Sequence, residues 1–83
     1  MQYKKIDSKN YSKWSFQRGL DNVRSADYYK VRNELKTALG ITTNPGFKYR
    51  VTGTVIPKGD EIEKIETIFH KYGVFEIWGP YES

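Results

Sequence analysis

The sequence has 83 residues and no cysteine. A chain of this length makes one small domain, and without cysteine neither disulfides nor a zinc-thiolate cluster can hold it together. No apolar run approaches the roughly 20 residues of a membrane span, and the first residues lack the apolar core of a secretion signal. We therefore expect a cytoplasmic protein that does not enter a membrane.

The charge is distributed unevenly along the chain. The net charge is +4, with eleven Lys and Arg against four acids in residues 1–50, and three against six in residues 51–83. A basic half is a candidate for a surface that faces a polyanion, although Lys and Arg also keep small domains soluble.

The first 24 residues predict a basic arm followed by a weak helix. The arm carries the lysines Lys4, Lys5, Lys9 and Lys13. It could lie along a DNA backbone or in a minor groove, or it could be disordered. Residues 10–23 mix their apolar spacings and include Gly19, and a glycine in a helix interior costs about 1 kcal/mol relative to alanine. The pattern there favours a helix only weakly.

Residues 25–40 have the pattern of an amphipathic helix. Ser25 is placed to cap the first turn, Asp27 suits the positive end of the helix dipole, and Gly40 can end the helix in the left-handed conformation. Apolar residues recur at spacings of three and four at Tyr28, Val31, Leu35, Ala38 and Leu39. This stripe predicts one buried face.

A second amphipathic helix is predicted from Asp60 to Gly73. Asp60 and Glu63 have the spacing of a capping box, and Gly73 can end the helix. The apolar stripe consists of Ile62, Ile65, Ile68, Phe69 and Tyr72. The residues that follow, 74–78, are rich in β-formers and could be a strand, a pairing tail or an apolar plug.

Between these helices, residues 40–53 read GITTNPGFKYRVTG. A structureless loop of this length is uncommon in a small domain, so we expect a turn and a short helix. Pro45 is tolerated in a first turn and Gly53 can close the helix. Phe47 and Val51, four residues apart, should point inward together. The candidate caps are Thr42 and Thr43, and the outward residues are Thr43, Asn44, Lys48, Tyr49 and Arg50.

A helix, a glycine turn and a short helix are the parts of a helix-turn-helix. Residues 35–42, LKTALGIT, resemble the Leu-Ala-x-x-Leu-Gly-Val-Ser run of Cro-like phage repressors. Residues 47–53, followed by Pro57, resemble the recognition helix of that family and its closing motif. The helix at residues 60–73 is similar to the one that usually follows.

The resemblance extends over residues 28–79 and includes short proteins of Bacteroidales and their phages. Two features differ from the repressor pattern: Lys36 stands where alanine is usual, and one more residue lies between Gly40 and Phe47. The extra residue is expected to lengthen or rotate the turn.

The resemblance implies a recognition helix at about residues 43–52 that binds double-stranded DNA. In a major groove, Asn44 could read adenine, Lys48 or Arg50 guanine, and Thr43 a thymine methyl group or a phosphate. The residues expected to contact phosphates are Thr42, Tyr49, Arg24, Lys30, Arg32 and Lys36. The same cations could equally form the ordinary polar face of an amphipathic helix.

The aromatic residues offer a different class of function. Most of the two Trp, seven Tyr and four Phe lie at helical spacings or beside aliphatic residues, which favours core packing over stacking on single-stranded bases. Phe75, Ile77 and Trp78, in the acidic half, could instead bind another protein or join two copies of the chain.

Catalysis has little support in the sequence. His70 is the single histidine, and with no cysteine it has no partner for a nucleophile pair or a metal site. The acids near residue 60 are explained by helix-start stabilisation. We expect no enzyme activity, no cofactor, no metal and no small-molecule substrate.

The sequence thus predicts a mainly α small helical bundle that contains a helix-turn-helix. Residues 1–24 form the arm and weak helix, residues 25–79 the helix-turn-helix domain with a possible short strand at its end, and residues 80–83 a tail. The expected function is sequence-specific DNA binding by a homodimer, because one short helix reads only a few base pairs.

Overall fold

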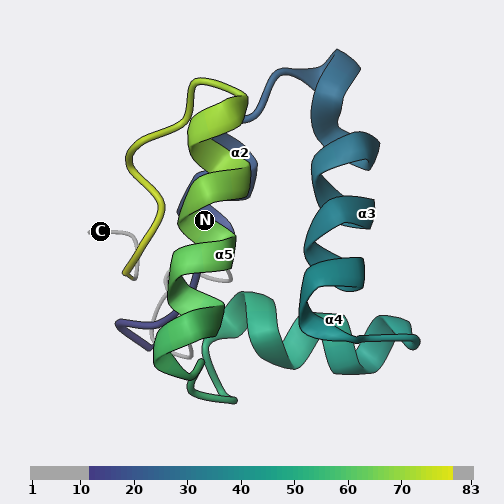
Figure 1. The fold of residues 1–83 in the computed structure, drawn as a ribbon, viewed down its shortest axis with the longest axis vertical. Coiled ribbons are helices and arrows are strands. Elements are labelled where there is room, and N and C mark those ends of the chain that lie inside the picture. The colour runs from purple at the N-terminus through teal and green to yellow at the C-terminus, as the bar shows by residue number, and fades with distance from the viewer. Residues whose placement is uncertain (1–11, 80–83) are drawn as a thin grey trace, which may run out of the picture.

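Helices account for most of the described part of the chain, residues 12–79, in the computed structural model. In chain order they are α2 (Gln17–Asp21), the 3-10 helix η1 (Ser25–Asp27), α3 (Tyr28–Leu39), α4 (Asn44–Thr52) and α5 (Gly59–Lys71). Figure 1 shows α3 and α5 running side by side, with α4 lying across their lower ends. Residues 12–79 contain no strand, so the expected mainly α bundle is confirmed. None of these helices is long and apolar enough to cross a membrane.

Helix α3 ends as expected but begins later. Gly40 closes it in the left-handed conformation, with φ of 67°. Ser25 lies in η1 and provides no side-chain cap, so the predicted role of Ser25 is wrong. The chain enters α3 through a 3-10 turn, in which the Asp27 amide donates to the Arg24 carbonyl at 2.9 Å. The buried positions of α3 are Val31, Leu35 and Leu39.

Helix α5 (Gly59–Lys71) begins at Gly59, and this starting residue determines which acid can cap the first turn. Glu61 is the third helical residue, and its Oε1 accepts a hydrogen bond from the Lys58 amide at 3.0 Å. The predicted capping box of Asp60 and Glu63 is therefore wrong by two positions. A carboxylate at the third position is the one that reaches back to the amide before the helix.

The chain on either side of α3, α4 and α5, which includes α2, completes the core. Phe16, Leu20 and Val23 from the N-terminal side and Val74 and Ile77 from the C-terminal side are buried with the helix residues. Residues 12–24 therefore belong to the same domain as residues 25–79. Lys4, Lys5, Lys9 and the tail at 80–83 lie outside the described residues.

The segment at residues 74–79 packs as an apolar plug against α2. The Gly19 amide donates to the Ile77 carbonyl at 3.2 Å, and the Gly79 amide donates to the Ser15 carbonyl at 3.0 Å. A Cβ at Gly19 would lie 3.0 Å from the Phe69 ring, so the absence of a side chain lets α2 approach α5. Of the three alternatives for this segment, the plug is the one found.

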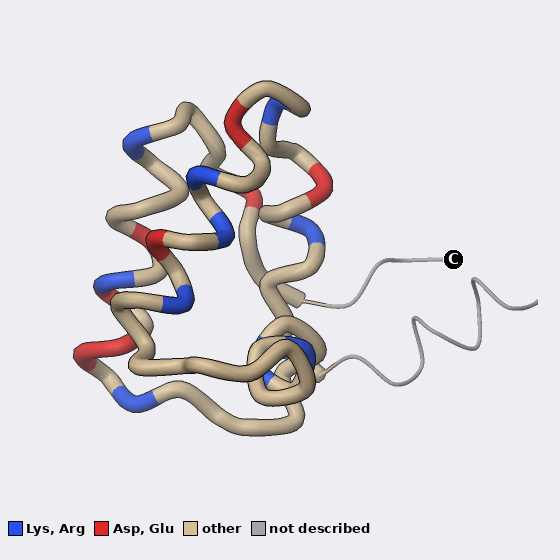
Figure 2. The backbone as a smooth tube through the Cα atoms, turned by 90° about the vertical axis from the view of Figure 1, so that its right-hand side faces the viewer, with Lys and Arg blue, Asp and Glu red and all other residues tan. Residues whose placement is uncertain are grey.

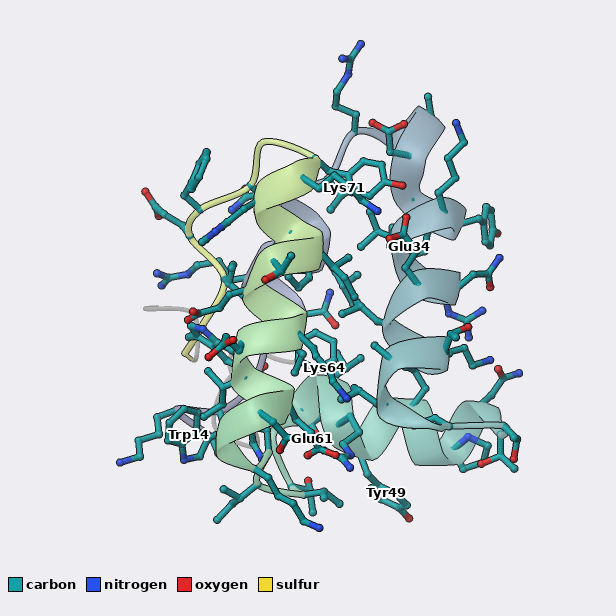
Figure 3. The ribbon with its side chains drawn as sticks, viewed as in Figure 1. Trp14, Glu34, Tyr49, Glu61, Lys64 and Lys71 are labelled. Carbon is teal, nitrogen blue, oxygen red and sulfur yellow. The ribbon has the colours of Figure 1, made fainter. Side chains whose placement is uncertain are left out.

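One polar cluster joins α3 to the end of α5 on the surface (Figure 3). Glu34 accepts hydrogen bonds from Lys71 Nζ and the Tyr72 hydroxyl. The bond from Lys71, followed by that from Tyr72, lowers the pKa of Glu34, and the bond to Glu34 raises the pKa of Tyr72. Both side chains of the Lys71–Glu34 ion pair are partly exposed to solvent, so the pair contributes little to the free energy of unfolding.

Candidate nucleic-acid interface

Helix α4 is built as its sequence predicts. Thr43 is the N-cap, and its Oγ1 accepts a hydrogen bond from the Gly46 amide at 3.1 Å. Pro45 lies in the first turn, where no helical acceptor is lost, and Gly53 closes the helix with φ of 80°. The sequence between the two glycines is therefore a turn at residues 40–43 followed by a helix.

Two apolar residues anchor α4 to the bundle. Phe47 and Val51 are buried, as their spacing predicts. The Phe47 ring packs edge-on against Phe16, with 6.1 Å between the centroids. Because both anchors lie on one side of the helix, the opposite side is left to solvent.

Lys48 and Tyr49 lie on the solvent side of α4. The Tyr49 side chain is 55% exposed, and Figure 3 shows it pointing away from the helix bundle. Thr42 and Thr43, in the turn before α4, are also exposed. These four residues keep the accessibility that the DNA-binding prediction requires.

The structure brings Arg32, Lys36 and Asn44 together. Arg32 Nη2 and Lys36 Nζ both donate to Asn44 Oδ1, at 3.0 and 3.1 Å. The two cations also lie over the Phe47 ring, 5.3 and 5.9 Å from its centroid. A carboxamide oxygen has two lone pairs, so these two donors use its accepting capacity. We call Arg32, Lys36 and Asn44 the cationic cluster.

The cationic cluster lies at the N-terminal end of α4, which carries the positive end of the helix dipole. The first turn of α4 contains no acid to offset this charge. Two cations and a helix N-terminus therefore share one exposed region, and an anion there would be stabilised by all three. This excess of positive charge is confined to the N-terminal end of α4, because Figure 2 shows Lys and Arg interleaved with Asp and Glu over the described helices as a whole.

Arg50 differs from its predicted role. Its guanidinium makes two hydrogen bonds to the carboxylate of Glu61, at 2.8 and 3.2 Å, and both side chains are more than four-fifths buried. The bonds from Arg50, followed by the bond from the Lys58 amide, lower the pKa of Glu61 from 4.5 to about 2. Arg50 therefore ties α4 to α5 and is not free to read a base.

Two of the residues assigned to an interface also belong to the fold. Ile77 is 3% exposed and lies in the core. Trp78 is half-buried, donates from Nε1 to Glu66 Oε2 at 2.8 Å, and meets Trp14 edge-on at 5.8 Å between centroids. Phe75 alone of the three is exposed, at 69%, and stacks on His70. The assignment of Ile77 to an interface is wrong because the plug turns it inward.

The acids of α5 interact with other side chains of the protein. Glu61 is bound to Arg50, Glu66 accepts from Trp78, and Asp60 lies 3.9 Å from Lys64. Residues 12–79 contain no group of His, Asp and Glu arranged to hold a metal ion.

Sequence reasoning missed the contact between residues 12–16 and the last turn of α4. Ser12 Oγ donates to the Gly53 carbonyl at 2.8 Å, and Ser15 Oγ donates to the Val51 carbonyl at 2.7 Å. A pair of serines three residues apart is common in loops, so no local signal marks these as partners of a helix almost 40 residues away.

Comparisons with models of protein families, with curated protein sequences and with solved structures found no match to this chain.

Proposed function

We propose that this protein is a sequence-specific double-stranded DNA-binding protein of the helix-turn-helix type, with α4 as its recognition helix. The observation that carries the proposal is the environment of α4. Phe47 and Val51 fix the helix across the end of the bundle, Lys48 and Tyr49 face solvent, and the cationic cluster stands at its N-terminus. A rigid, exposed helix with cations beside it is suited to enter a major groove while its flanks meet phosphates.

Each exposed residue has a role in this proposal. Lys48 is the candidate for guanine, whose major-groove edge offers two acceptors. Tyr49, Thr42 and Thr43 are candidates for phosphate contacts that position the helix.

The cationic cluster changes the role of Asn44. Reading adenine takes both a donor and an acceptor from one carboxamide, but Oδ1 already accepts from Arg32 and Lys36. We therefore assign Asn44 to holding the two cations in place, and Arg32 and Lys36 to phosphate contacts.

A regulator of phage or mobile-element type, acting in the cytoplasm as a homodimer, remains our proposal for the biological setting. Two copies related by a two-fold axis would present α4 to half-sites one helical turn apart. Phe75 is the exposed member of the residues considered for the dimer contact, whereas Ile77 is held in the core.

The first experiment is selection of bound sequences from a random duplex pool, followed by fluorescence anisotropy with the selected duplex. Lys48→Ala should weaken binding by about 5- to 150-fold, which corresponds to the roughly 1–3 kcal/mol of one good base contact, and should relax the preference at one base pair. Lys64→Ala is the matched control, because Lys64 is an exposed lysine of α5 and is not among the residues expected to contact DNA.

The outcome that would contradict the proposal is equally specific. If no sequence is enriched and binding does not weaken with salt, the duplex is not the ligand, since phosphate contacts make DNA affinity strongly salt-dependent. If Lys48→Ala and Lys64→Ala weaken binding equally, α4 is not the reading helix.

A second candidate is a module that binds another protein through its acidic, aromatic C-terminal half. The observation in its favour is that Phe75 is 69% exposed beside the acidic Glu76. Binding of that kind should depend on apolar contact and change little with salt, whereas duplex binding should weaken steeply.

A further inference from the structure

Two aliphatic side chains are left exposed beside the C-terminal end of α4. Val55 is 42% exposed and Ile56 is 66% exposed. Every other Val, Ile and Leu among residues 12–79 is buried or half-buried. A single exposed aliphatic side chain is ordinary in a folded protein, but two adjacent ones make a small apolar patch. We call Val55 and Ile56 the apolar pair.

The backbone holds the apolar pair close to α4. The Thr54 and Val55 amides both donate to the Tyr49 carbonyl, at 3.0 and 3.3 Å. Pro57, which follows the pair, is buried. The loop is thus attached to the last turns of α4 on one side and to the protein interior on the other. The apolar pair therefore has a fixed place next to the proposed recognition helix.

The chain that carries the apolar pair is nearly uncharged. From Tyr49 to Pro57 the one charged residue is Arg50, and its guanidinium is bound to Glu61. The C-terminal end of α4 also carries the negative end of the helix dipole, which disfavours a phosphate. The cationic cluster lies at the opposite end of the helix. The two ends of α4 therefore suit different parts of a duplex, phosphates at the N-terminal end and an apolar group at the C-terminal end.

The apolar group that the major groove offers is the 5-methyl group of thymine. Four residues separate Lys48 from Thr52, the last residue of α4. A helix rises about 1.5 Å per residue and base pairs are about 3.4 Å apart, so this separation corresponds to about two base pairs along a groove. The apolar pair follows directly after the end of α4. A duplex that lies along α4 with a guanine at Lys48 would place a base about two to three pairs away against the apolar pair.

We propose, on the basis of the proposed function of α4, that Val55 and Ile56 contact the methyl group of a thymine about two to three base pairs from the base that Lys48 reads. The apolar pair then contributes to sequence preference. The cationic cluster, which meets phosphates, does not.

The test replaces each thymine of the selected duplex in turn by deoxyuridine, which pairs in the same way but lacks the 5-methyl group. Affinity is measured by fluorescence anisotropy. Removal of the contacted methyl group should weaken binding about fourfold, which corresponds to the roughly 0.8 kcal/mol of one buried methyl group. Deoxyuridine at positions away from the apolar pair should leave the affinity unchanged.

A protein variant identifies the side chains that sense the methyl group. Val55→Ser/Ile56→Ser should bind the thymine and deoxyuridine duplexes equally, because the apolar surface against the methyl group is removed. Tyr29→Ser is the matched control, because Tyr29 is 71% exposed at the N-terminal end of α3, away from α4. The control should keep the preference for thymine. Urea unfolding checks that both variants are folded, and the single variants Val55→Ser and Ile56→Ser replace the double variant if it is not.

The outcomes separate this proposal from the proposed function. Weaker binding to deoxyuridine at one such position, absent in Val55→Ser/Ile56→Ser and present in Tyr29→Ser, supports the role of the apolar pair. No thymine selected there, no effect of deoxyuridine, or the same effect in the double variant overturns it, while Lys48 and α4 remain the reading elements.

Two further results would also overturn the role of the apolar pair. If the double variant turns a dimer into a monomer in sedimentation and loses affinity for both duplexes equally, Val55 and Ile56 join two copies of the chain. If the unmodified protein enriches no sequence and its binding does not weaken with salt, the proposed function fails, and the thymine contact fails with it.

Discussion

Gly53→Ala should destabilise this protein much more than Gly40→Ala, although both glycines end a helix in the left-handed conformation. Their φ values, 80° and 67°, are similar, so the backbone strain of an alanine should be similar at both positions. The strain is about 1–2 kcal/mol for an L-residue, reduced by about 0.4–1 kcal/mol because alanine restricts the unfolded chain. Gly40→Ala should therefore cost about 1 kcal/mol, since no atom lies within 4 Å of the added Cβ.

At Gly53 the added methyl group would clash with residues 12–16, the N-terminal segment that precedes α2. The separation of 2.1 Å from Ser12 Oγ cannot be kept, so this segment must move away from α4. The move breaks the bonds from the Ser12 amide to Thr52 and from the Ser12 hydroxyl to Gly53, each contributing about 1 kcal/mol. Together with the backbone strain, the expected cost is about 3 kcal/mol, a large part of the 5–15 kcal/mol typical of a domain.

Urea unfolding followed by tryptophan fluorescence measures this difference, because Trp14 and Trp78 meet in the folded state. The free energy of unfolding of Gly53→Ala should lie about 2 kcal/mol below that of Gly40→Ala. For a domain of this size the same difference lowers the melting temperature by roughly a further 8–16 °C. Equal stabilities would show that residues 12–16 do not hold α4.

Further predictions concern the Arg50–Glu61 ion pair, and the buried Ile77 and exposed Phe75 of the plug at residues 74–79. The folded pKa of Glu61, about 2, lies below its usual 4.5, so the pair with Arg50 stabilises the fold fully above about pH 4.5 and is lost as the pH falls toward 2. Glu61→Gln should cost about 2–3 kcal/mol at pH 7, because a pKa lowered from 4.5 to about 2 corresponds to stabilisation of that size. The variant should also make stability less dependent on pH between about 5 and 2, measured by urea unfolding across that range. The same acid sensitivity in the variant would contradict the assignment. Ile77→Ala should cost about 2–5 kcal/mol, whereas Phe75→Ala should change stability by less than about 0.5 kcal/mol, and equal costs would contradict the placement of the plug.

The structure also changes how the α4 surface should be tested by mutation. Removing Lys48 and Arg50 together would confound two effects, because Arg50 holds α4 to α5 through Glu61. Lys48→Ala alone changes a side chain that faces solvent. A loss of binding in that variant, with an unchanged melting temperature, reports on the surface and not on the fold.

The helices that could be predicted are those whose signals are local. Val31, Leu35 and Leu39 recur at the helical period and are buried in α3 as expected. Thr43 and Gly53 bracket α4, where the cap and the left-handed glycine act within a few residues of the helix they end. These features depend on neighbours in sequence, so the sequence contains the information needed to place them.

The candidate site was only partly predictable, because the role of a side chain depends on what lies across from it. Lys48 and Tyr49 keep the exposure that helical spacing gives them. Arg50, one residue further along, meets Glu61 on the next helix, and Asn44 meets two cations of α3. The helical period shows the side of the helix on which Arg50 and Asn44 lie, and the packing of the helices decides which groups they meet there.

The sequence by itself determined a small, mainly helical domain with a turn and short helix between two amphipathic helices, because spacing, caps and glycines act over a few residues. The tertiary structure decided that Ile77 fills the core and that Ser12 and Ser15 bind the end of α4, 41 and 36 residues along the chain from their acceptors. Such contacts follow from which surfaces are left to bury and which carbonyls are left to satisfy once the helices have packed. That information is a property of the assembled core, and no local segment of the sequence contains it.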